Sequence, residues 1–303
     1  MRFELKSEID VGEPTLGDAL TQASEFLDSS GCFFGHGTDN AWDEAVLLLF
    51  WVMDILEDPG CELLSKYLNQ TYRRKFEDAI NLRAEERIPA AYIIGEAWFC
   101  GLRFIVNQHV LVPRSPIAEL VQQNYRPWVV KQPKRILDLC CGSGCIGIAA
   151  AMFDHNVEVV LADLSLEALA IAEKNICRYA LKDRVIVSQG DLFERLSGEK
   201  FDLILSNPPY VDARDLAEMP IEYRHEPPMG LGSGNDGLGI ARQILRSAGS
   251  HLNEGGSLIM ELGNSWANLE QAYPAFPFTW VEFGQGGQGV CAIAKKELEE
   301  KPF

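Results

Sequence analysis

The first third of the 303-residue chain carries its apolar residues at helical spacing. Pro14 suits the first turn of a helix, which we expect to run to about Ser29. The glycine-rich stretch 31–37 interrupts this pattern, and Asp39 or Asn40 is placed to cap the next helix. One face of that second helix is apolar, as expected for a helix in a bundle. The residues that form this face are Ala45, Leu48, Leu49, Val52, Ile55 and Leu56.

The pattern then changes from helical to extended. A third helical stretch covers 62–86, and residues 97–112 are strand-like, with Cys100 and Gly101 at the turn of a short hairpin. A further helix is expected over 116–130, where Pro116 occupies its first turn. These elements predict a helical lobe at 1–87 followed by a β-hairpin linker at 88–115.

From residue 135 onward, short apolar runs alternate with helical stretches. Such runs are typical of a parallel sheet that helices cover on both faces, so we predict an α/β fold. Two more segments, 278–283 and 289–294, are expected to pair as a terminal hairpin and bring the sheet to seven strands. The five apolar runs expected as earlier strands are 136–139, 157–162, 184–189, 201–206 and 255–262.

Composition narrows the class of protein. At 47% hydrophobic residues the chain is neither disordered nor membrane-like, and its longest apolar run, 45–53, is too short to span a bilayer. The start of the chain lacks a signal-peptide pattern. The eight cysteines are dispersed without a Cys-x-x-Cys pair, so we expect reduced thiols, no metal site and a cytoplasmic protein.

The most informative stretch is Asn207-Pro208-Pro209-Tyr210, directly after the apolar run 201–206. Two prolines hold the chain rigid at the carboxyl end of a strand, where open α/β sheets bind ligands. The Asn207 side chain, the Pro208 carbonyl and the flat Tyr210 ring together suit a planar group that carries an NH₂. These four residues are the predicted catalytic set, with Asn207 also next to the cofactor, and the chemistry they favour is methylation of nitrogen.

A second candidate feature is the turn between the run 136–139 and the helix that follows. Its glycines allow positive φ and close approach of a ligand, although the pattern is neither the full dinucleotide fingerprint nor a P-loop. An ordinary strand–helix turn would also explain a single Gly-x-Gly. The residues expected to bind a cofactor here are Asp138, Cys140, Cys141, Gly142, Ser143 and Gly144.

Acidic residues end the next two predicted strands. Asp163 lies about 20 residues beyond the glycine turn, where a carboxylate commonly binds ribose hydroxyls. Asp191 is placed to accept from the exocyclic amine of adenine, with Leu192 as an apolar contact, although a helix cap is an alternative role for Asp191. A ligand with ribose and adenine but no required pyrophosphate fits S-adenosylmethionine better than a dinucleotide, with S-adenosylhomocysteine as product.

These motifs, with the upstream segment 92–101, resemble the protein-(glutamine-N5) methyltransferases that modify translation proteins. The segments 110–119 and 222–227 look like the branch that acts on the third protein of the large ribosomal subunit. The resemblance implies a Rossmann-like class I methyltransferase domain at 116–303 and a substrate-recognition role for the helical lobe. The sequence departs from the family pattern at Cys140 and Cys141, where other members carry Gly and Thr or similar residues, and also at Leu192.

The net charge of −17 bears on the partner. A chain this acidic repels nucleic-acid phosphates and attracts a basic protein, such as a ribosomal protein, although charge can also serve solubility alone. Three alternatives stay open from the sequence: glutamine methylation of release factors, amino-methylation of adenine in nucleic acid, and a binding module without turnover. Arg114 is interpreted either as an anchor of a loop over the cofactor or as a salt-bridge residue, and His225 as a substrate contact or a solvated loop residue.

Overall fold

The computed structural model resolves the chain into two compact units, which we describe separately. The helical unit comprises residues 1–97 together with 220–225, and the sheet unit comprises 98–219 and 226–303. The residues whose structure is described are 2–6, 13–55, 60–284, 286–300 and 303.

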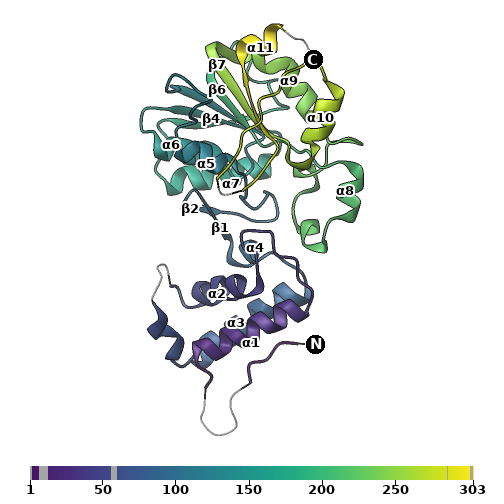
Figure 1. Cartoon of the computed structure of the whole chain (residues 1–303). Helices are drawn as coiled ribbons and strands as arrows, with labels where there is room; N and C mark the ends of the chain where they lie inside the picture. Colours follow the sequence, from purple (N-terminus) through teal and green to yellow (C-terminus); the bar gives the residue numbers. More distant parts are fainter. Residues whose placement is uncertain (1, 7–12, 56–59, 285, 301–302) are drawn as a thin grey trace. The chain divides into compact units, whose positions relative to one another are not determined.

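The helical unit is built from four α-helices and two short 3₁₀ helices within its described residues (Figure 1). Their apolar faces enclose a core in which Leu48, Phe76 and Ile80 are fully buried. The elements are α1 (Leu16–Ser29), α2 (Ala41–Val52), η1 (Cys61–Ser65), α3 (Gln70–Glu85), α4 (Ala90–Ile94) and η2 (Ile221–His225).

Side-chain caps determine where these helices begin. The Thr15 hydroxyl accepts from Asp18 N in a capping box, so α1 starts at Leu16, two residues after Pro14. Of the two predicted caps of α2, Asp39 and Asn40, the structure selects Asn40, whose side chain accepts from the Asp43 N–H. The helical stretch expected over 62–86 is divided into η1 and α3, because Asn69 caps a new helix at Gln70.

A two-stranded hairpin, β1 (Glu96–Phe99) and β2 (Leu102–Ile105), follows the helices. Its turn is formed by Cys100 and Gly101, which have φ values of 52° and 75°. Two left-handed residues between paired strands match the twist of a tight hairpin, as the sequence predicts. The hairpin is shorter than the strand-like pattern of 97–112 suggests.

The sheet unit is organised around a six-stranded sheet of order β5-β4-β3-β6-β7-β8. The first five strands in this order are parallel, and β8 runs antiparallel to β7. This confirms the α/β fold. The strands are β3 (Arg135–Leu139), β4 (Glu158–Asp163), β5 (Val185–Gln189), β6 (Phe201–Ser206), β7 (Leu252–Glu261) and β8 (Val290–Ala294).

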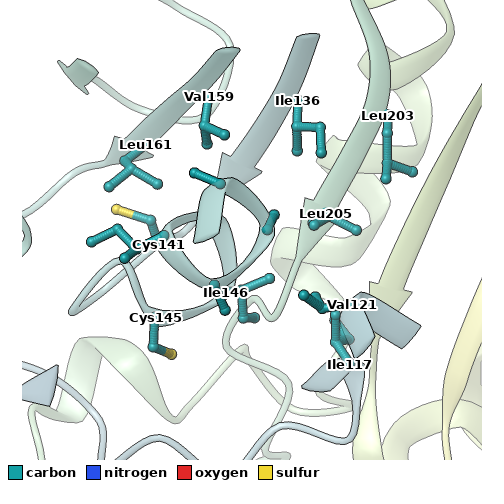
Figure 2. Packing of buried hydrophobic residues seen from close by; sticks show 14 of the residues in the cluster. Ile117, Val121, Ile136, Cys141, Cys145, Ile146, Val159, Leu161, Leu203 and Leu205 are labelled. Carbon is teal, nitrogen blue, oxygen red and sulfur yellow. The ribbon is translucent and has the colours of Figure 1, made fainter. Parts of the chain in front are cut away.

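Successive residues of each strand face opposite sides of the sheet, and both sides are buried. Ile136 and Leu161 belong to one apolar cluster, and Leu137 and Val160 to another. Figure 2 shows the first cluster, in which side chains from β3, β4 and β6 gather around Ile146. Burial on both faces explains why these strands are continuous apolar runs.

Helices cover both faces (Figure 1). Residues of α5, α6 and α7 pack into the first cluster, and residues of α9, α10 and α11 pack into the second. No helix of the described ranges is long and apolar enough to cross a membrane. The α-helices of the sheet unit are α5 (Ile117–Gln122), α6 (Cys145–Phe153), α7 (Leu166–Arg178), α8 (Ala213–Glu218), α9 (Gly239–His251), α10 (Trp266–Ala272) and α11 (Lys295–Glu300); its 3₁₀ helices are η3 (Pro228–Gly230) and η4 (Gly263–Ser265).

Two elements differ from the sequence prediction. The helix expected over 116–130 ends at Gln122, where the next residues adopt other conformations and Asn124 has a φ of 53°. The seventh strand, expected over 278–283, is reduced to an isolated antiparallel bridge between Trp280 and Cys291 of β8. Few ladder hydrogen bonds form there, so the described sheet has six strands rather than seven.

Candidate active site at the carboxyl ends of the strands

The register of the sheet brings the predicted site residues to one edge. Leu139 of β3 lies opposite Ala162 of β4 and also opposite Ser206 of β6. The strands are parallel, so the residues that follow each of them emerge at the same edge. The chain order reverses at β3, which has β4 on one side and β6 on the other, and such a switch point is where α/β sheets bind ligands.

The glycines of the turn after β3 and of the first turn of α6 differ in the space around them: Gly142 is open, whereas Gly144 and Gly147 are crowded. A Cβ added at Gly144 would lie 2.8 Å from a Leu161 methyl, and one at Gly147 only 2.4 Å from the other Leu161 methyl. These two glycines therefore let α6 pack closely on the sheet. A Cβ at Gly142 would meet no atom within 4 Å, and its φ is 55°. Gly142 is thus the position of this turn where a ligand can approach the backbone.

Most backbone donors of the turn are already engaged within the protein. Cys141 N donates to the Ala162 carbonyl (3.1 Å), and Gly144 N donates to the Cys141 carbonyl (2.8 Å). Gly142 N donates to Oδ2 of Asp163 (2.9 Å). Phosphate-binding turns instead direct free N–H groups at the anion. With three of its N–H donors occupied and a carboxylate beside it, this turn favours a cationic ligand over a pyrophosphate.

The cysteines of the turn serve packing. Cys141 and Cys145 are buried in the first apolar cluster (Figure 2), and Cys140 is half-buried against the second. Burial raises the pKa of all three thiols, which keeps them neutral. Ser143 is also buried, and its carbonyl accepts from the Asn175 side chain (2.9 Å). Only Cys140 and Gly142 of this turn are partly exposed.

Asp163, at the end of β4, is half-buried and holds two backbone donors. Its Oδ1 accepts from Ser165 N (2.9 Å), while its Oδ2 binds Gly142 N. Burial raises the pKa of the Asp163 carboxyl. Each carboxylate oxygen can accept a second hydrogen bond, so the group retains capacity for ribose hydroxyls. The structure therefore places Asp163 where the sequence predicts it.

Asp191 and Leu192 follow β5. Asp191 is exposed, and its side chain makes no hydrogen bond or ion pair with another residue of the described ranges. Leu192 is half-buried against the second apolar cluster and has a φ of 48°. An exposed carboxylate next to an apolar side chain suits an aminated ring, which is the role predicted for the two residues.

Asp138 is placed differently from the other candidate carboxylates. It is 0% exposed, and its Oδ2 accepts from Gly147 N at the start of α6 (2.8 Å). Among the described residues its Oδ1 has no hydrogen-bond partner. Burial raises the pKa of Asp138 to about 7. In this arrangement the side chain positions the helix behind the glycine turn and does not face solvent.

The Asn-Pro-Pro-Tyr motif leaves the end of β6. The Ser206 hydroxyl donates to the Leu139 carbonyl (2.8 Å), which ties the motif to β3. Asn207 is half-buried, and its side chain forms no hydrogen bond with other described residues, so its amide is available to a ligand. Pro208 is buried and Pro209 half-buried. The rigid pair thus separates an available amide from the aromatic ring that follows.

Tyr210 is held in place through both its side-chain hydroxyl and its backbone carbonyl. Its hydroxyl donates to Oε1 of Glu261 (3.0 Å), and its carbonyl accepts from the Ser265 hydroxyl (2.6 Å). A Cβ at Gly263 would lie 2.4 Å from the Tyr210 ring, so the glycine lets the chain pass against it. The sequence predicts the flat face of Tyr210 but not the contacts that fix its orientation.

Glu261 and Ser115 were missed by the sequence analysis. Glu261 ends β7 and is buried, and its Oε2 accepts from the Ser115 hydroxyl (2.5 Å). Burial raises the pKa of Glu261, whereas the bonds from Ser115 and Tyr210 lower it. An acid at the end of a buried strand is the same signal that identified Asp163, and it was available for Glu261 as well. Nothing in the sequence indicates its pairing with Ser115.

Arg114 forms a two-point ion pair with Glu226. Its Nη1 and Nη2 lie 2.5 and 2.6 Å from the two carboxylate oxygens, and the Glu226 carboxylate is fully buried. Val112 N donates to the same carboxylate (3.0 Å). The structure thus shows Arg114 as a salt-bridge residue within the sheet unit, and its role as an anchor of a loop over the cofactor stays a prediction.

His225 and the glycine-rich stretch 229–237 are ordered by contacts to other elements. His225 belongs to the helical unit, where its Nε2 lies 2.9 Å from the Glu86 carbonyl. The stretch 229–237 is tied to the rest of the sheet unit by Ser233, whose carbonyl accepts from Gly239 N (3.1 Å). In the part of the chain that the structure describes, no cluster of three or more His, Cys, Asp or Glu side chains could hold a metal ion.

Comparison with known proteins relates this chain to methyltransferases. The family model for the methyltransferase small domain matches residues 121–222. The ribosomal protein uL3 glutamine methyltransferase of Francisella tularensis subsp. tularensis is 41% identical over 286 residues, which cover 94% of this chain and 91% of that protein. The protein of the same name from Bordetella pertussis is 39% identical and covers 94% of this chain and 96% of that protein. A crystal structure of a methyltransferase from Pyrococcus furiosus has a TM-score of 0.48 and 20% identity, over 71% of this chain and 98% of that one.

Arg114→Ala is expected to lower the free energy of unfolding by about 3–5 kcal/mol, because it removes the two-point partner of a buried carboxylate. The free energy of unfolding of Arg114→Lys should lie between those of the wild type and Arg114→Ala, since an ammonium keeps the charge but not the paired hydrogen bonds. Urea denaturation measures both. Arg214→Ala is the matched control: its pair with Glu218 is exposed, and we expect a change within about 0.5 kcal/mol. Equal losses for Arg114→Ala and Arg214→Ala would contradict the assignment.

The raised pKa of Asp138 predicts a pH-dependent stability. With a folded pKa of about 7 against an ordinary 3.8, the folded protein holds a proton that the unfolded chain releases. The contribution of this bound proton to the free energy of unfolding is complete below pH 4. It is lost as pH rises to about 7, with a slope of about 1.4 kcal/mol per pH unit. Relative to Asp138→Asn, the wild-type free energy of unfolding should therefore fall by about 2–4 kcal/mol across this range in urea denaturation. Parallel pH profiles of the two proteins would rule this out.

Proposed function

The chain belongs to the ribosomal protein uL3 glutamine methyltransferase family, and we propose that it transfers a methyl group from S-adenosylmethionine to the side-chain amide nitrogen of a glutamine in uL3. The observation that carries this proposal is the 39–41% identity to proteins of that name along 94% of the chain. Two features of the site support it: an available Asn207 amide at the end of β6 and a glycine turn suited to a cationic ligand.

The residues present at the strand ends fit S-adenosylmethionine. Its sulfonium and ammonium are positive, which suits a turn in which three N–H groups are already engaged and the Asp163 carboxylate lies alongside. Asp163 has remaining acceptor capacity for the ribose hydroxyls, and Asp191 with Leu192 would receive the adenine. Gly142 leaves the space through which the methionine portion can approach. The enclosed Asp138 is assigned to positioning α6 and the turn.

Asn207 would hold the amide to be methylated. Its side-chain oxygen and the Pro208 carbonyl can each accept one N–H of a glutamine carboxamide, and the two together orient the amide plane. The Tyr210 ring would pack over that plane, and the Glu261 carboxylate keeps the ring in place through the tyrosine hydroxyl. Specificity for a primary amide follows from these two acceptors, since a group without two N–H donors leaves one acceptor unpaired.

Placement is the main catalytic task of these residues. The methyl of a bound sulfonium is already electrophilic, so the chain has to align the acceptor nitrogen with the C–S bond. Alignment of this kind can supply about 7–11 kcal/mol. An amide nitrogen is a weak nucleophile, and the acceptors at Asn207 and Pro208 would stabilise positive charge as it develops on that nitrogen. The surplus proton can pass to water after transfer, so no general base is required.

The acidic charge of the chain fits a basic protein as substrate and disfavours bare nucleic acid. Release factors and an aminated base remain the competing acceptors, because the same acceptor geometry receives any planar NH₂ group. We propose that the reaction takes place in the cytoplasm, where dispersed cysteines without a Cys-x-x-Cys pair are expected to stay reduced.

The substrate is tested by methyl transfer from labelled S-adenosylmethionine to purified uL3, a release factor and duplex DNA, with mass spectrometry to locate the added methyl. We expect label on one glutamine amide of uL3 and on neither of the other acceptors. Label on the release factor would keep the chemistry and overturn the substrate, whereas label on DNA would overturn both.

Asn207→Ala is expected to abolish methyl transfer while leaving cofactor affinity within about threefold, because the side chain acts on the acceptor amide. Calorimetric titration with S-adenosylmethionine and the uL3 assay measure the two quantities. Asn207→Asp serves as the matched variant, since it keeps one acceptor oxygen at the same position. If Asn207→Ala lost cofactor affinity and activity in parallel, Asn207 would be a cofactor residue instead.

A further inference from the structure

Asn175 is the one polar side chain among the buried residues of α7, and the proposed function gives it no role. It is 0% exposed and shares the buried face of the helix with Ala172 and Ile176, which belong to the first apolar cluster. A leucine would fill such a position without burying a polar group. Burial of an amide costs free energy unless its atoms are hydrogen-bonded, so an asparagine here directs attention to its bonding partners.

The Asn175 amide joins two segments that lie far apart in the sequence. Its Oδ1 accepts from Ile105 N (2.8 Å) and its Nδ2 donates to the Ile105 carbonyl (3.1 Å), so it binds both backbone groups of the last residue of β2. Its Nδ2 also donates to the Ser143 carbonyl in the glycine turn (2.9 Å). Both amide hydrogens and the amide oxygen are thus engaged, and all three residues belong to the sheet unit.

The bond to Ser143 acts on the most adaptable part of the turn. Gly142 and Gly144 flank Ser143, with φ values of 55° and 76°, and glycine backbone has access to many other conformations. The peptide group between Ser143 and Gly144 is held on both sides, its carbonyl by Asn175 and its N–H by the Cys141 carbonyl (2.8 Å). Because a peptide group is planar, these two bonds together fix its orientation. Loss of Asn175 removes one of the two.

The other contacts of the turn act on its neighbouring residues. Asp163 holds Gly142 through the Gly142 N–H, and the crowding at Gly144 and Gly147 comes from Leu161 of β4. Neither contact acts on the Ser143 carbonyl. The orientation of this peptide group therefore depends on a side chain of α7 rather than on the turn itself.

We infer that Asn175 is a positioning residue for the cofactor: it holds the peptide group after Ser143 in one orientation and so keeps the glycine turn ready for the amino-acid portion of S-adenosylmethionine. The inference rests on the proposed function, which places that portion of the cofactor at Gly142. A turn that is already ordered loses less conformational freedom on binding, which raises affinity. The nucleoside portion is assigned to Asp163 and Asp191, whose carboxylates are not bonded to Asn175 in the part of the chain that the structure describes.

The first test compares Asn175→Ala with Tyr179→Phe in the full chain. The Tyr179 hydroxyl donates to the Arg103 carbonyl (2.7 Å), so Tyr179→Phe also removes a side-chain bond to β2 but leaves the turn untouched. Calorimetric titration is done with S-adenosylmethionine and with 5′-methylthioadenosine, which lacks the amino-acid portion. For Asn175→Ala we expect the Kd of S-adenosylmethionine to rise about 5- to 20-fold and that of 5′-methylthioadenosine to stay within about twofold. Tyr179→Phe should match the wild type with both ligands.

An unchanged Kd of S-adenosylmethionine in Asn175→Ala would overturn the inference, as would equal losses for the two ligands, which indicate general damage to the sheet unit. An equally large and selective loss in Tyr179→Phe would assign the effect to the anchoring of β2 instead. Neither titration contains uL3. If the wild type binds the cofactor but transfers no methyl to uL3, the proposed substrate is wrong and the role of Asn175 stands. If the wild type binds no S-adenosylmethionine, both are wrong.

Amide hydrogen exchange of the wild type gives a second test in case Asn175→Ala does not fold. The Ile105 N–H donates to Asn175, so its exchange rate reports on this side chain. By thermodynamic linkage, a cofactor that binds better when Asn175 holds the turn must stabilise the bonds of Asn175 in return. Saturating S-adenosylmethionine should therefore slow exchange at Ile105 about fivefold more than at Arg135, whose N–H donates to Asp202 at the amino end of β3 (3.0 Å). Equal slowing at both amides would show general stabilisation alone and contradict the inference.

Discussion

The in-register parallel pairing of β3 with both β4 and β6 is the constraint on which the rest of the site depends. Leu139 lies opposite Ala162 and Ser206, so the chain leaves three adjacent strands at one level. The glycine turn, Asp163 and Asn207 are thereby brought to one edge of the sheet. Burial of both faces keeps these strands apolar, so polar chemistry is confined to the residues at their ends.

The electrostatic character of that edge of the sheet depends on which N–H donors and carboxylates are already hydrogen-bonded within the protein. Three N–H groups of the turn, those of Cys141, Gly142 and Gly144, are bonded to carbonyls and to the Asp163 carboxylate, so they are not directed at an anion as in a phosphate site. Carboxylates remain, at Asp163 and Asp191. A positively charged sulfonium cofactor is favoured by this arrangement for the same reason that a pyrophosphate is disfavoured, and the family of the chain leads to the same cofactor class.

The Asn-Pro-Pro-Tyr segment of the candidate site combines local rigidity with long-range support. Pro208 and Pro209 hold the backbone after Asn207, and this follows from the sequence alone. The orientation of Tyr210 depends on Glu261, which is in turn bonded to Ser115. Such support around a reacting group is what turns a set of suitable side chains into a site of defined geometry.

The sequence by itself determined the α/β class, most strand positions, a helix cap at Asp39 or Asn40, the hairpin turn and the candidate residues of the strand ends. Periodicity, capping and turn formation act over a few residues, so they can be recognised locally. The early end of α5, the reduced seventh strand and the enclosure of Asp138 were decided by packing. Only the tertiary structure decided the pairs Arg83–Glu222, Arg114–Glu226 and Ser115–Glu261, which join residues 139, 112 and 146 positions apart. Charge and hydrogen-bonding capacity are properties of single residues, whereas the choice of partner depends on the path of the whole chain.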